Sequence, residues 1–577
     1  MDRAGSAALR ILPEGRLAAV PTGVTLRKAL LGAGIPVRGN CGGNGTCGQC
    51  RVRANGEWVL SCEHVVDGDA TVFVPVSSRV PSGRLLDQSI PPHHRPHAPV
   101  TNARSESSAE QPRGGNAQAP PLPGQVALAI DAGTTTISLS LLSLSPGEGA
   151  VFSPGGLLAT RSVFNPQIAF GDDVISRINY AQQNAGGPAE LRDAIMDEIN
   201  RQTRALLLAM PRLEIVRVVI AGNTTMMRIL LGLDLEPVRS DTLGDWAMKT
   251  HCTNARDVGL DESHDVPVLI LPVVSGWIGG DVVAGVLSSG MAERPGVRLL
   301  IDLGTNGEMV MGCRDWLVAC SCSAGPAFEG GGIAWGMPAG PGAIDRVNID
   351  PHDMSVHCDV IGGERPEGIC GSGLVSALKS MLSAGIIDRS GRLVDWRQDS
   401  HGYDGLQAGS ASSGWQAARD IAVSGKFRVA TSRWDEEITL SSSDLMTAIR
   451  AKAAVYAGMK TLEQELGIGL DSLDEILVAG GFGSSLDIES AVAIGLLPDL
   501  PRTRFRVIGN SSLQGAVVCA MSPEAASLAQ AIARRVTYMD LTRHPGFQGQ
   551  FTRAMFLPHT DLEQFASQSS RRPGQSS

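Results

Sequence analysis

The pattern of apolar and polar positions predicts a small β-rich domain at the start of the chain. Residues 6–20 alternate loosely between apolar and polar side chains around a Pro-Glu-Gly turn, which is typical of a β-hairpin. Residues 25–33 predict a short helix that ends at a glycine. Residues 51–60 alternate about an Asn-Gly turn and predict a second hairpin, and residues 70–76 predict a last strand. We therefore expect a first domain over residues 1–76.

The pattern changes after this domain. Across residues 77–124 apolar side chains almost vanish, and Pro, Ser, Gly, His, Gln and Arg dominate, which predicts a flexible linker. Such a tether would let the first domain move between two sites and would raise its local concentration at each of them. An inert spacer is the alternative. The polar tail over residues 564–577 is also expected to be disordered.

The remainder of the chain carries three buried strands that each lead into a turn rich in small and polar residues. A strand that begins at Val126 leads into Asp-Ala-Gly-Thr-Thr-Thr over 131–136, and a second strand follows. The same order returns with Asp-Leu-Gly-Thr over 302–305. A third strand leads into Ala-Gly-Gly-Phe-Gly over 479–483, where a helix is expected to begin. Two similar turns followed by a Gly-Gly turn predict two related half-domains.

These turns suit a nucleotide. Glycine lets the backbone approach a phosphate, N–H and hydroxyl groups bind its oxygens, and an aspartate can hold hydrated Mg²⁺. The Gly-Gly turn suits close packing against adenine or ribose. The combination resembles the actin, sugar kinase and Hsp70 superfamily of ATP-binding folds, in which two related halves close on ATP. We expect an α+β and α/β multidomain protein, with a middle domain over 125–210 and a large C-terminal domain over 211–563.

Helical patterns surround these strands. Residues 190–210 and 442–466 predict amphipathic helices, and Ser441 is a candidate N-cap of the second one. A predicted strand over 217–220 leads into Asn223-Thr-Thr, which either caps a helix or contacts phosphate. We favour the cap.

Four cysteines lie close together in the first domain, at Cys41, Cys47, Cys50 and Cys62. Four thiolates in a glycine-rich stretch can enclose a metal ion or a cluster, because glycine lets the backbone wrap closely. The spacing resembles a ferredoxin-type [2Fe–2S] loop in a β-grasp domain, although its first gap holds five residues where the plant-type loop has four. Zinc is the rival, but only one Cys-x2-Cys knuckle is present. Disulfides would need an oxidising compartment, and the first 20 residues lack the apolar core of a signal peptide.

Composition narrows the classes of function. The chain has 577 residues and a net charge of −10, so no overall basic surface indicates a nucleic-acid binder. Its most apolar stretches, 126–144 and 266–291, are interrupted by Asp131 and Asp281, and they predict buried strands and helices rather than membrane spans. We therefore expect a cytoplasmic protein without a nucleic-acid or membrane partner.

Together, the cysteine loop, the linker and the ATP-binding pattern make the chain similar to the reductive activators of corrinoid proteins. The stretches that carry this resemblance are the cysteine loop, 165–177, 222–225, 302–308, 323–330, 368–373 and 479–483. The resemblance implies an ATP-dependent enzyme that passes an electron through its [2Fe–2S] cluster, returning Co(II) to Co(I) in the corrinoid protein of a methyltransferase system. It also implies an electron-donating reductase or ferredoxin as a second partner, and a C-terminal domain that can form a homodimer.

The resemblance also assigns roles to residues. Its cluster ligands are Cys41, Cys47, Cys50 and Cys62. ATP and Mg²⁺ are the other expected cofactors. Catalytic roles fall to Asp131 and Asp302, and the nucleotide site is expected to include Gly133, Thr134, Thr135, Thr136, Gly304, Thr305, Asn306, Gly480, Gly481 and Gly483.

Two other functions stay open. An ATP-dependent redox sensor would let the state of the cluster set the conformation of the ATPase, without a cobalt acceptor. A sugar-kinase-like small-molecule kinase would carry the cluster domain as an accessory, although the sequence shows no obvious substrate pocket. An activator predicts an ATPase that a corrinoid protein stimulates, a kinase predicts phosphate transfer to a metabolite, and a sensor predicts neither.

Overall fold

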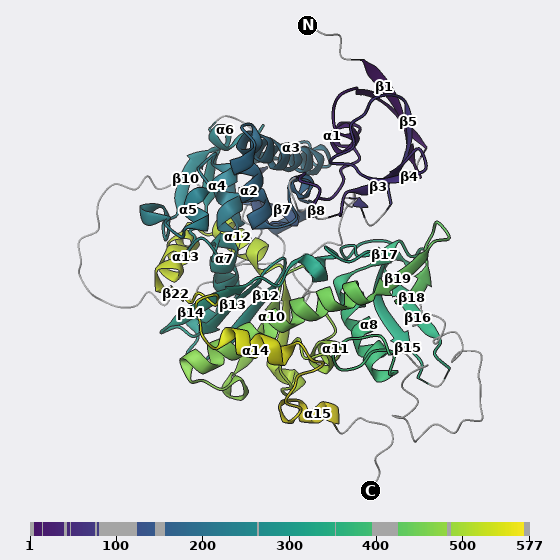
Figure 1. The fold of residues 1–577 in the computed structure, drawn as a ribbon. Coiled ribbons are helices and arrows are strands. Elements are labelled where there is room, and N and C mark those ends of the chain that lie inside the picture. The colour runs from purple at the N-terminus through teal and green to yellow at the C-terminus, as the bar shows by residue number, and fades with distance from the viewer. Residues whose placement is uncertain are drawn as a thin grey trace, which may run out of the picture.

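The structure is a computed structural model of the chain (Figure 1). Of the predicted linker, only residues 78, 79 and 124 are described, and the last part of the predicted tail lies outside the described residues. The described residues are 5–13, 15–39, 43–46, 48–75, 78–79, 124–144, 156–261, 265–351, 353–394, 425–481 and 486–569.

The first domain is a five-stranded sheet with one helix packed on it, as the sequence predicts (Figure 1). Its strand order β2-β1-β5-β3-β4 puts the first and last strands side by side in parallel, which is the β-grasp arrangement. Thr25 caps the helix by accepting a hydrogen bond from the Lys28 N–H, and Leu26 and Leu30 are buried in the core of the domain. The elements are β1 (Ser6–Leu12), β2 (Arg16–Pro21), α1 (Leu26–Gly32), β3 (Arg51–Ala54), β4 (Glu57–Leu60) and β5 (Ala70–Phe73).

A six-stranded sheet forms the first half of the large body that follows the first domain. β6, β7 and β8 are an antiparallel meander, and β9 and β11 continue the sheet in parallel with β6. Its strands are β6 (Gln125–Ala132), β7 (Thr136–Ser143), β8 (Leu157–Phe164), β9 (Glu214–Gly222), β10 (His251–Asn254) and β11 (Pro267–Ile270). Its helices are η3 (Pro166–Ala169), α2 (Val174–Gln183), α3 (Gly187–Leu208), α4 (Thr224–Leu230), α5 (Glu236–Arg239), η4 (Gly244–Trp246) and α6 (Ala255–Val258).

The second half repeats this plan. β12, β13 and β14 form an antiparallel meander, and β20 and β21 continue the sheet in parallel with β12. Its strands are β12 (Arg298–Leu303), β13 (Gly307–Gly312), β14 (Leu317–Cys322), β20 (Glu475–Ala479), β21 (Phe505–Gly509) and β22 (Val536–Tyr538). Matching meanders in both sheets agree with the two related half-domains that the sequence predicts.

The expected division between 125–210 and 211–563 passes through the first sheet. β9 begins at Glu214, after that division, yet it pairs in parallel with β6, which begins at Gln125. A long helical segment separates the two strands in sequence, so their pairing is a tertiary contact that no local pattern reveals. The first half-body therefore continues to β11 and the helix that follows it.

Smaller sheets and further helices complete the second half (Figure 1). The long helix predicted over 442–466 is present, and Ser441 and Asp444 form a capping box at its start. The strands are β15 (Ala343–Ile349), β16 (Val356–Val360), β17 (Gly368–Ile369), β18 (Lys426–Thr431) and β19 (Glu437–Ser441). The helices are η5 (Met291–Glu293), η6 (Pro326–Glu329), η7 (Ile361–Gly363), α8 (Gly371–Ser383), α10 (Ser442–Leu466), η8 (Leu470–Ser472), α11 (Ile488–Ala493), η10 (Arg502–Arg504), α13 (Pro523–Arg535), α14 (Phe547–Ala554), η11 (Glu563–Phe565) and α15 (Ala566–Ser569).

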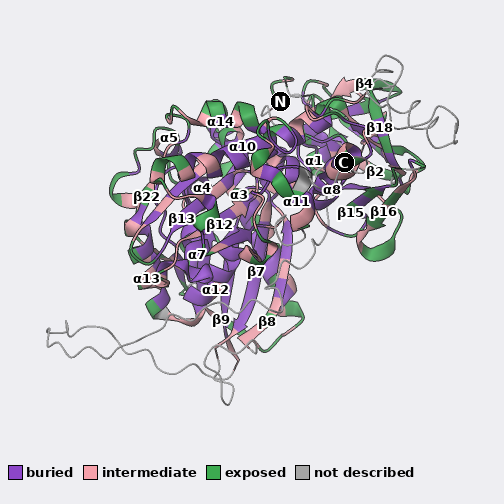
Figure 2. Cartoon of the chain, turned by 90° about the horizontal axis from the view of Figure 1, so that it is seen from below, coloured by how far each residue is buried: buried purple, intermediate pink, exposed green. Residues whose placement is uncertain are grey.

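Two central helices, α7 (Gly280–Ser289) and α12 (Ser511–Met521), join the halves. Each follows the equivalent parallel strand of its own half, β11 or β21, and they pack against each other in a core shared by both sheets. Figure 2 shows this central region as almost entirely buried. The helices approach closely at Gly515, where a Cβ would lie 2.3 Å from the carbonyl oxygen of Ala284. Only glycine fits at this crossing.

Within the described part of the chain, no helix combines the length and the apolar character that crossing a bilayer requires. The apolar stretch over 266–291 forms β11 and α7 and is buried in the body, as the sequence predicts.

The crossing of α7 and α12 yields a testable prediction. A Gly515→Ala substitution should push the two helices apart, because its Cβ would overlap the backbone of Ala284. We expect the free energy of unfolding to fall by about 1–3 kcal/mol, and the thermal unfolding midpoint to fall with it. Gly549→Ala in α14 is the matched control, since its Cβ would meet no atom within 4 Å. Equal midpoints for the two variants would show that this contact does not limit the packing.

Candidate functional site

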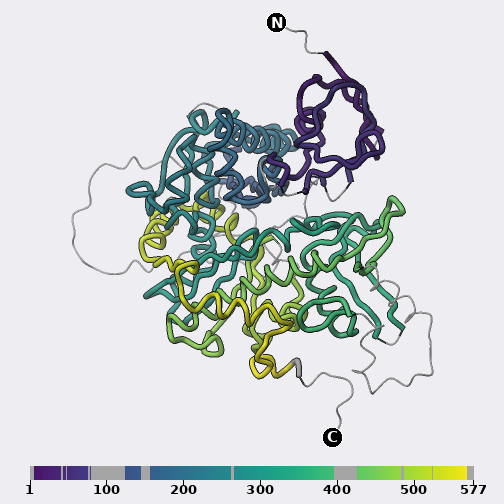
Figure 3. The backbone as a smooth tube through the Cα atoms, in the orientation of Figure 1, coloured from purple at the N-terminus to yellow at the C-terminus, as the bar shows by residue number. Residues whose placement is uncertain are grey.

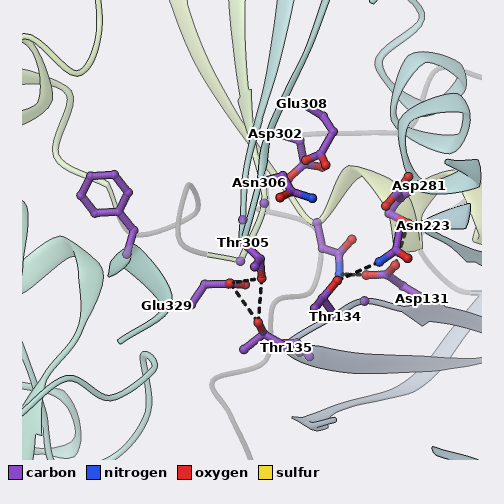
Figure 4. A pocket seen from close by; sticks show the side chains of 18 of the residues that line it. Asp131, Thr134, Thr135, Asn223, Asp281, Asp302, Thr305, Asn306, Glu308 and Glu329 are labelled. Atoms are coloured by element: carbon purple, nitrogen blue, oxygen red, sulfur yellow. Dashed lines mark hydrogen bonds between the residues drawn. The ribbon is translucent and has the colours of Figure 1, made fainter. Parts of the chain in front are cut away.

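The three predicted turns meet in one cleft between the half-bodies (Figure 4). Asp131 lies near the end of β6 and Asp302 near the end of β12, at equivalent positions of the two meanders. The cleft encloses about 1020 Å³, its open mouth included. Of the expected nucleotide-site residues, Gly483 lies outside the described residues. All the others line this cleft: Asp131, Gly133, Thr134, Thr135, Thr136, Asp302, Gly304, Thr305, Asn306, Gly480 and Gly481.

The Gly-Gly turn after β20 packs directly against the second polar turn. Gly480 has a φ of +95°, and a Cβ there would lie 2.4 Å from the Leu303 carbonyl oxygen and 2.7 Å from Oδ1 of Asp302. No side chain fits in that space, and the positive φ itself favours glycine. The turn thereby brings a bare stretch of backbone to the wall of the cleft.

The two equivalent aspartates have different surroundings. Asp131 accepts hydrogen bonds from Asn510 Nδ2 at 2.8 Å and from Ser512 Oγ at 2.7 Å, both at the start of α12. Asp302 has one long contact, 3.4 Å from Ser511 Oγ. Asp131 is therefore held between the half-bodies, whereas the carboxylate of Asp302 keeps most of its capacity to accept hydrogen bonds from a ligand.

Further carboxylates crowd the cleft that sequence reasoning did not assign to it: Asp281, Glu308 and Glu329. Burial, and then the negative charges of Asp281, Asp131 and Glu329, raise the pKa of Asp302 to about 7. Burial is also the main cause of the raised pKa values of the three additional carboxyls. A positive ion brought into this cleft would therefore be strongly favoured.

Glu329 connects the two polar turns. Its Oε2 accepts hydrogen bonds from Thr135 Oγ1 at 2.9 Å and from Thr305 Oγ1 at 2.5 Å (Figure 4). The two hydroxyl oxygens lie 2.8 Å apart, although they belong to different half-bodies. One carboxylate thus bridges the cleft at the two groups that were expected to bind phosphate.

Asn223 caps a helix and also lines the cleft. Its Oδ1 accepts a hydrogen bond from the Met226 N–H and caps α4, which confirms the cap. Its Nδ2 donates to Thr134 Oγ1 at 2.8 Å, and the residue lines the cleft. The cap therefore also positions one hydroxyl of the first polar turn.

The sequence carries a signal for each of these three carboxylates. Asp281 interrupts an apolar stretch, and a charged residue at the start of a buried helix requires a partner or a ligand. Glu308 and Glu329 fall inside the stretches 302–308 and 323–330 that carry the family resemblance. Their meeting in one cleft depends on the closure of the two half-bodies.

The structure describes two of the four clustered cysteines. Cys50 and Cys62 are buried, and their sulfur atoms lie 3.3 Å apart. This separation is well beyond the bond length of about 2.05 Å in a disulfide and about 0.5 Å shorter than the roughly 3.8 Å between two thiolates on one tetrahedral metal. These thiols therefore fit a shared metal or cluster better than a disulfide. Cys41 and Cys47 lie outside the described residues.

Three described glycines of the loop around these cysteines have a backbone conformation that other residues rarely adopt. Gly43, Gly45 and Gly48 have φ values of +105°, +70° and +70°. These angles agree with the close wrapping of the backbone that the sequence predicts, in the part of the loop that the structure describes. Among the described residues, no three His, Cys, Asp or Glu side chains form a ready metal site.

Family models match nearly the whole body of the chain. A model of the 2Fe-2S iron-sulfur cluster binding domain matches residues 9–73. A model of the RACo middle region matches residues 126–294, and a model of the C-terminal ASKHA domain of RACo matches residues 296–569. The last two models meet close to residue 295, whereas the sequence pattern placed the division after residue 210.

Individual proteins that resemble the chain also act on corrinoid proteins, as their names state. The corrinoid activation enzyme RamQ of Eubacterium limosum is 31% identical over 425 residues, which cover 73% of this chain and 68% of that protein. A reductase of the Co(II) methylated amine-specific corrinoid protein, from Methanosarcina barkeri, is 27% identical over 266 residues, or 43% of each chain. A solved structure of a reductive activator for corrinoid, iron-sulfur protein aligns with a TM-score of 0.67 at 31% identity, covering 97% of this chain and all of that one.

The crowded carboxylates predict an unusual dependence of stability on pH. The pKa of Asp281 is raised to about 7 in the folded protein from about 4 in the unfolded chain. The folded state therefore binds the proton more tightly, and stability falls as the pH rises through the window from about 4 to about 7. An Asp281→Asn variant cannot ionise, so in a metal chelator its thermal unfolding midpoint should exceed that of the parent by much more at pH 8 than at pH 5, and match it only below about pH 4.

The exposed Asp315 provides the control for this experiment, because its side chain is 69% exposed and lies outside the cleft. Asp315→Asn should leave the unfolding midpoint unchanged at both pH values. If Asp281→Asn shifts the midpoint equally at pH 5 and pH 8, the repulsion among the carboxylates is not the cause.

The paired thiols yield a separate prediction. A Cys62→Ser variant, purified anaerobically, should lose the visible charge-transfer band and the S = 1/2 EPR signal that dithionite produces in the parent. Cys252→Ser should keep both signals, since Cys252 is exposed on β10 of the first half-body. A colourless, zinc-containing parent protein would contradict the cluster assignment.

Proposed function

Because the chain belongs to the family of reductive activators of corrinoid proteins, we propose that it passes one electron from a [2Fe–2S] cluster to the Co(II) of a corrinoid protein, which becomes Co(I), in a cycle that consumes ATP. One observation supports this proposal most directly. Two equivalent polar turns and a Gly-Gly turn converge on one cleft, in a chain whose first domain holds a pair of buried cysteine thiols. The cluster, when bound, supplies a one-electron carrier.

The cleft residues suit the parts of Mg-ATP. The hydroxyl and N–H groups of 134–136 and 304–306 would bind phosphate oxygens, and the backbone at 480–481 would pack against adenosine. Mg²⁺ usually keeps several waters and is bound through one or two carboxylates together with the phosphates. Asp302 is a candidate for this role, because it begins the second polar turn, accepts one weak hydrogen bond and has neighbours of like charge. The ion would offset that repulsion.

Energy explains why ATP is needed in such a cycle. Reduction of Co(II) by a cluster of ordinary potential is uphill. If the protein bound the reduced or more easily reduced acceptor about 10⁴-fold more tightly, the gain of about 5.5 kcal/mol would shift the potential by roughly 240 mV. The protein and its reduced acceptor must then be separated before another cycle can begin, because so tight a complex would not dissociate quickly by itself. Hydrolysis of ATP to ADP and phosphate, between halves that move relative to each other, would release the acceptor.

The partners follow from the same proposal. They are a corrinoid protein of a methyltransferase system as the acceptor, and an electron-donating reductase or ferredoxin as the source. A homodimer formed through the C-terminal domain and a cytoplasmic location belong to the proposal as well.

The proposed function predicts a separation of two activities. An Asp302→Ala variant should keep the spectrum of its cluster, since Asp302 lies in the body and not in the first domain. It should reduce a corrinoid protein for at most one turnover, while ATP hydrolysis and multiple turnover fall by about 10²-fold or more. The measurement follows the Co(I) absorbance and phosphate release in the same sample.

The control for this test is Asp315→Ala, at an exposed position outside the cleft. Both of its activities should match those of the parent. Multiple turnover in Asp302→Ala would overturn the assignment of Asp302, and ATP-dependent phosphorylation of a small metabolite by the parent would favour the kinase.

A further inference from the structure

The side of the first domain that carries the cysteine loop contacts the large body formed by the two half-bodies. Arg38 lies just before the cysteine loop, and its side chain reaches out of its own domain. Its Nη1 donates to the Gly330 carbonyl oxygen at 2.9 Å, and its Nη2 donates to the Gly336 carbonyl oxygen at 3.3 Å. Its Nε donates to the Arg79 carbonyl oxygen, just after the first domain. Arg38 is only 5% exposed, so this contact is part of a closed interface.

The loop itself also faces the body. Asn44 lies between the first two cysteines, and its Nδ2 donates to Gln183 Oε1 at 3.3 Å, at the end of α2. Figure 3 shows the purple first domain next to the helices of the first half-body and over the green part of the second. The docked domain therefore contacts both half-bodies.

A buried charge marks the centre of this interface. Asp172 is 5% exposed, and neither of its carboxylate oxygens has a hydrogen-bond partner among the described residues. Three positive groups lie close enough to act on it, namely Arg38 and Arg27 of the first domain and Arg177 of the body. The pKa of Asp172 is about 6, raised by burial and lowered by these guanidinium groups. Removing the first domain would leave Asp172 without two of its three counter-charges.

A chain of contacts connects the interface at Arg38 to the second polar turn. The Gly330 carbonyl that Arg38 holds belongs to the residue after Glu329, whose carboxylate binds Thr135 and Thr305. Gly330 has a φ of +82°, and a Cβ there would lie 2.5 Å from the Met337 backbone nitrogen. This tight turn leaves little freedom between the cleft carboxylate and the docking carbonyl.

A second chain of contacts connects the interface near Asp172 to the first polar turn. Arg177 is fully buried, and its Nη2 donates to the Thr134 carbonyl oxygen at 2.5 Å. Its Nε donates to the Gly171 carbonyl oxygen at 2.9 Å, next to Asp172. A shift of either polar turn is therefore carried to the surface that the first domain occupies.

We propose that the surface formed by Asp172, Gly330 and Gly336 is a docking site for the chain's own cysteine-loop face, the face of the first domain that carries Arg38 and Asn44. We propose further that a nucleoside triphosphate bound in the cleft releases this face from the docking site. The nucleotide part rests on the proposed function. A phosphate and the Glu329 carboxylate would compete for the hydroxyls of Thr135 and Thr305, and their like charges exclude sharing. Displacement of Glu329 moves the Gly330 carbonyl away from Arg38. Docking holds Arg38 and Asn44 of this face against the body, and release leaves the face free to contact another protein.

The test uses the full-length protein with its cluster and follows hydrogen–deuterium exchange of residues 43–46 and 330–337. Arg38→Ala should speed exchange in both segments about tenfold, the effect of losing a charge-assisted hydrogen bond. Asp172→Asn should act in the same direction from the body side. Arg10→Ala is the matched control, because Arg10 is exposed on β1. An unchanged visible spectrum shows that each variant keeps its cluster.

Nucleotide is then added as a non-hydrolysable ATP analogue with Mg²⁺, and its binding is measured separately by calorimetry. With the analogue bound, residues 43–46 and 330–337 of the parent should exchange as fast as they do in Arg38→Ala. The analogue should not change the exchange rates of Arg38→Ala itself. Bound analogue with no change in the parent would overturn the release while leaving the proposed function intact. Absence of binding would overturn both the release and the nucleotide site. Equal exchange in Arg38→Ala, Asp172→Asn and Arg10→Ala would overturn the docking site itself.

Discussion

The contact between α7 and α12 is the constraint on which the rest of the structure depends. The helices come from different half-bodies, and the space at Gly515 admits no side chain. Because they cross so closely, their first turns lie together at the cleft, where Asp281 comes from one and the Asn510 and Ser512 side chains from the other. The two sheets, and with them the two polar turns, are positioned by this crossing.

That closeness concentrates negative charge. Five carboxylates, of Asp131, Asp281, Asp302, Glu308 and Glu329, line a single cleft. Their raised pKa values express an unfavourable free energy that the fold tolerates at this place and that a bound cation would relieve. Such a loss of stability is common at binding sites, where the demands of function and of stability oppose each other.

Local patterns in the sequence were enough to predict the hairpins of the first domain, the cap of α10 and the strand–turn–strand units around Asp131 and Asp302. These features are set by neighbours in the chain. The pairing of β9 with β6, and the arrival of Glu329 between Thr135 and Thr305, join segments that are far apart in sequence. Only packing determines them, so the sequence pattern predicts a domain division that passes through the sheet, and it assigns Glu329 no role.

The unequal hydrogen bonding of the two equivalent aspartates has a consequence for how a repeated unit can specialise. Asp131 is occupied by the side chains of Asn510 and Ser512, whereas Asp302 keeps its oxygens almost unused. Asp131 therefore helps to hold the two half-bodies together, whereas Asp302 keeps most of its capacity to accept hydrogen bonds. Two polar side chains at the start of one helix are enough to give two equivalent residues of a repeated unit different properties.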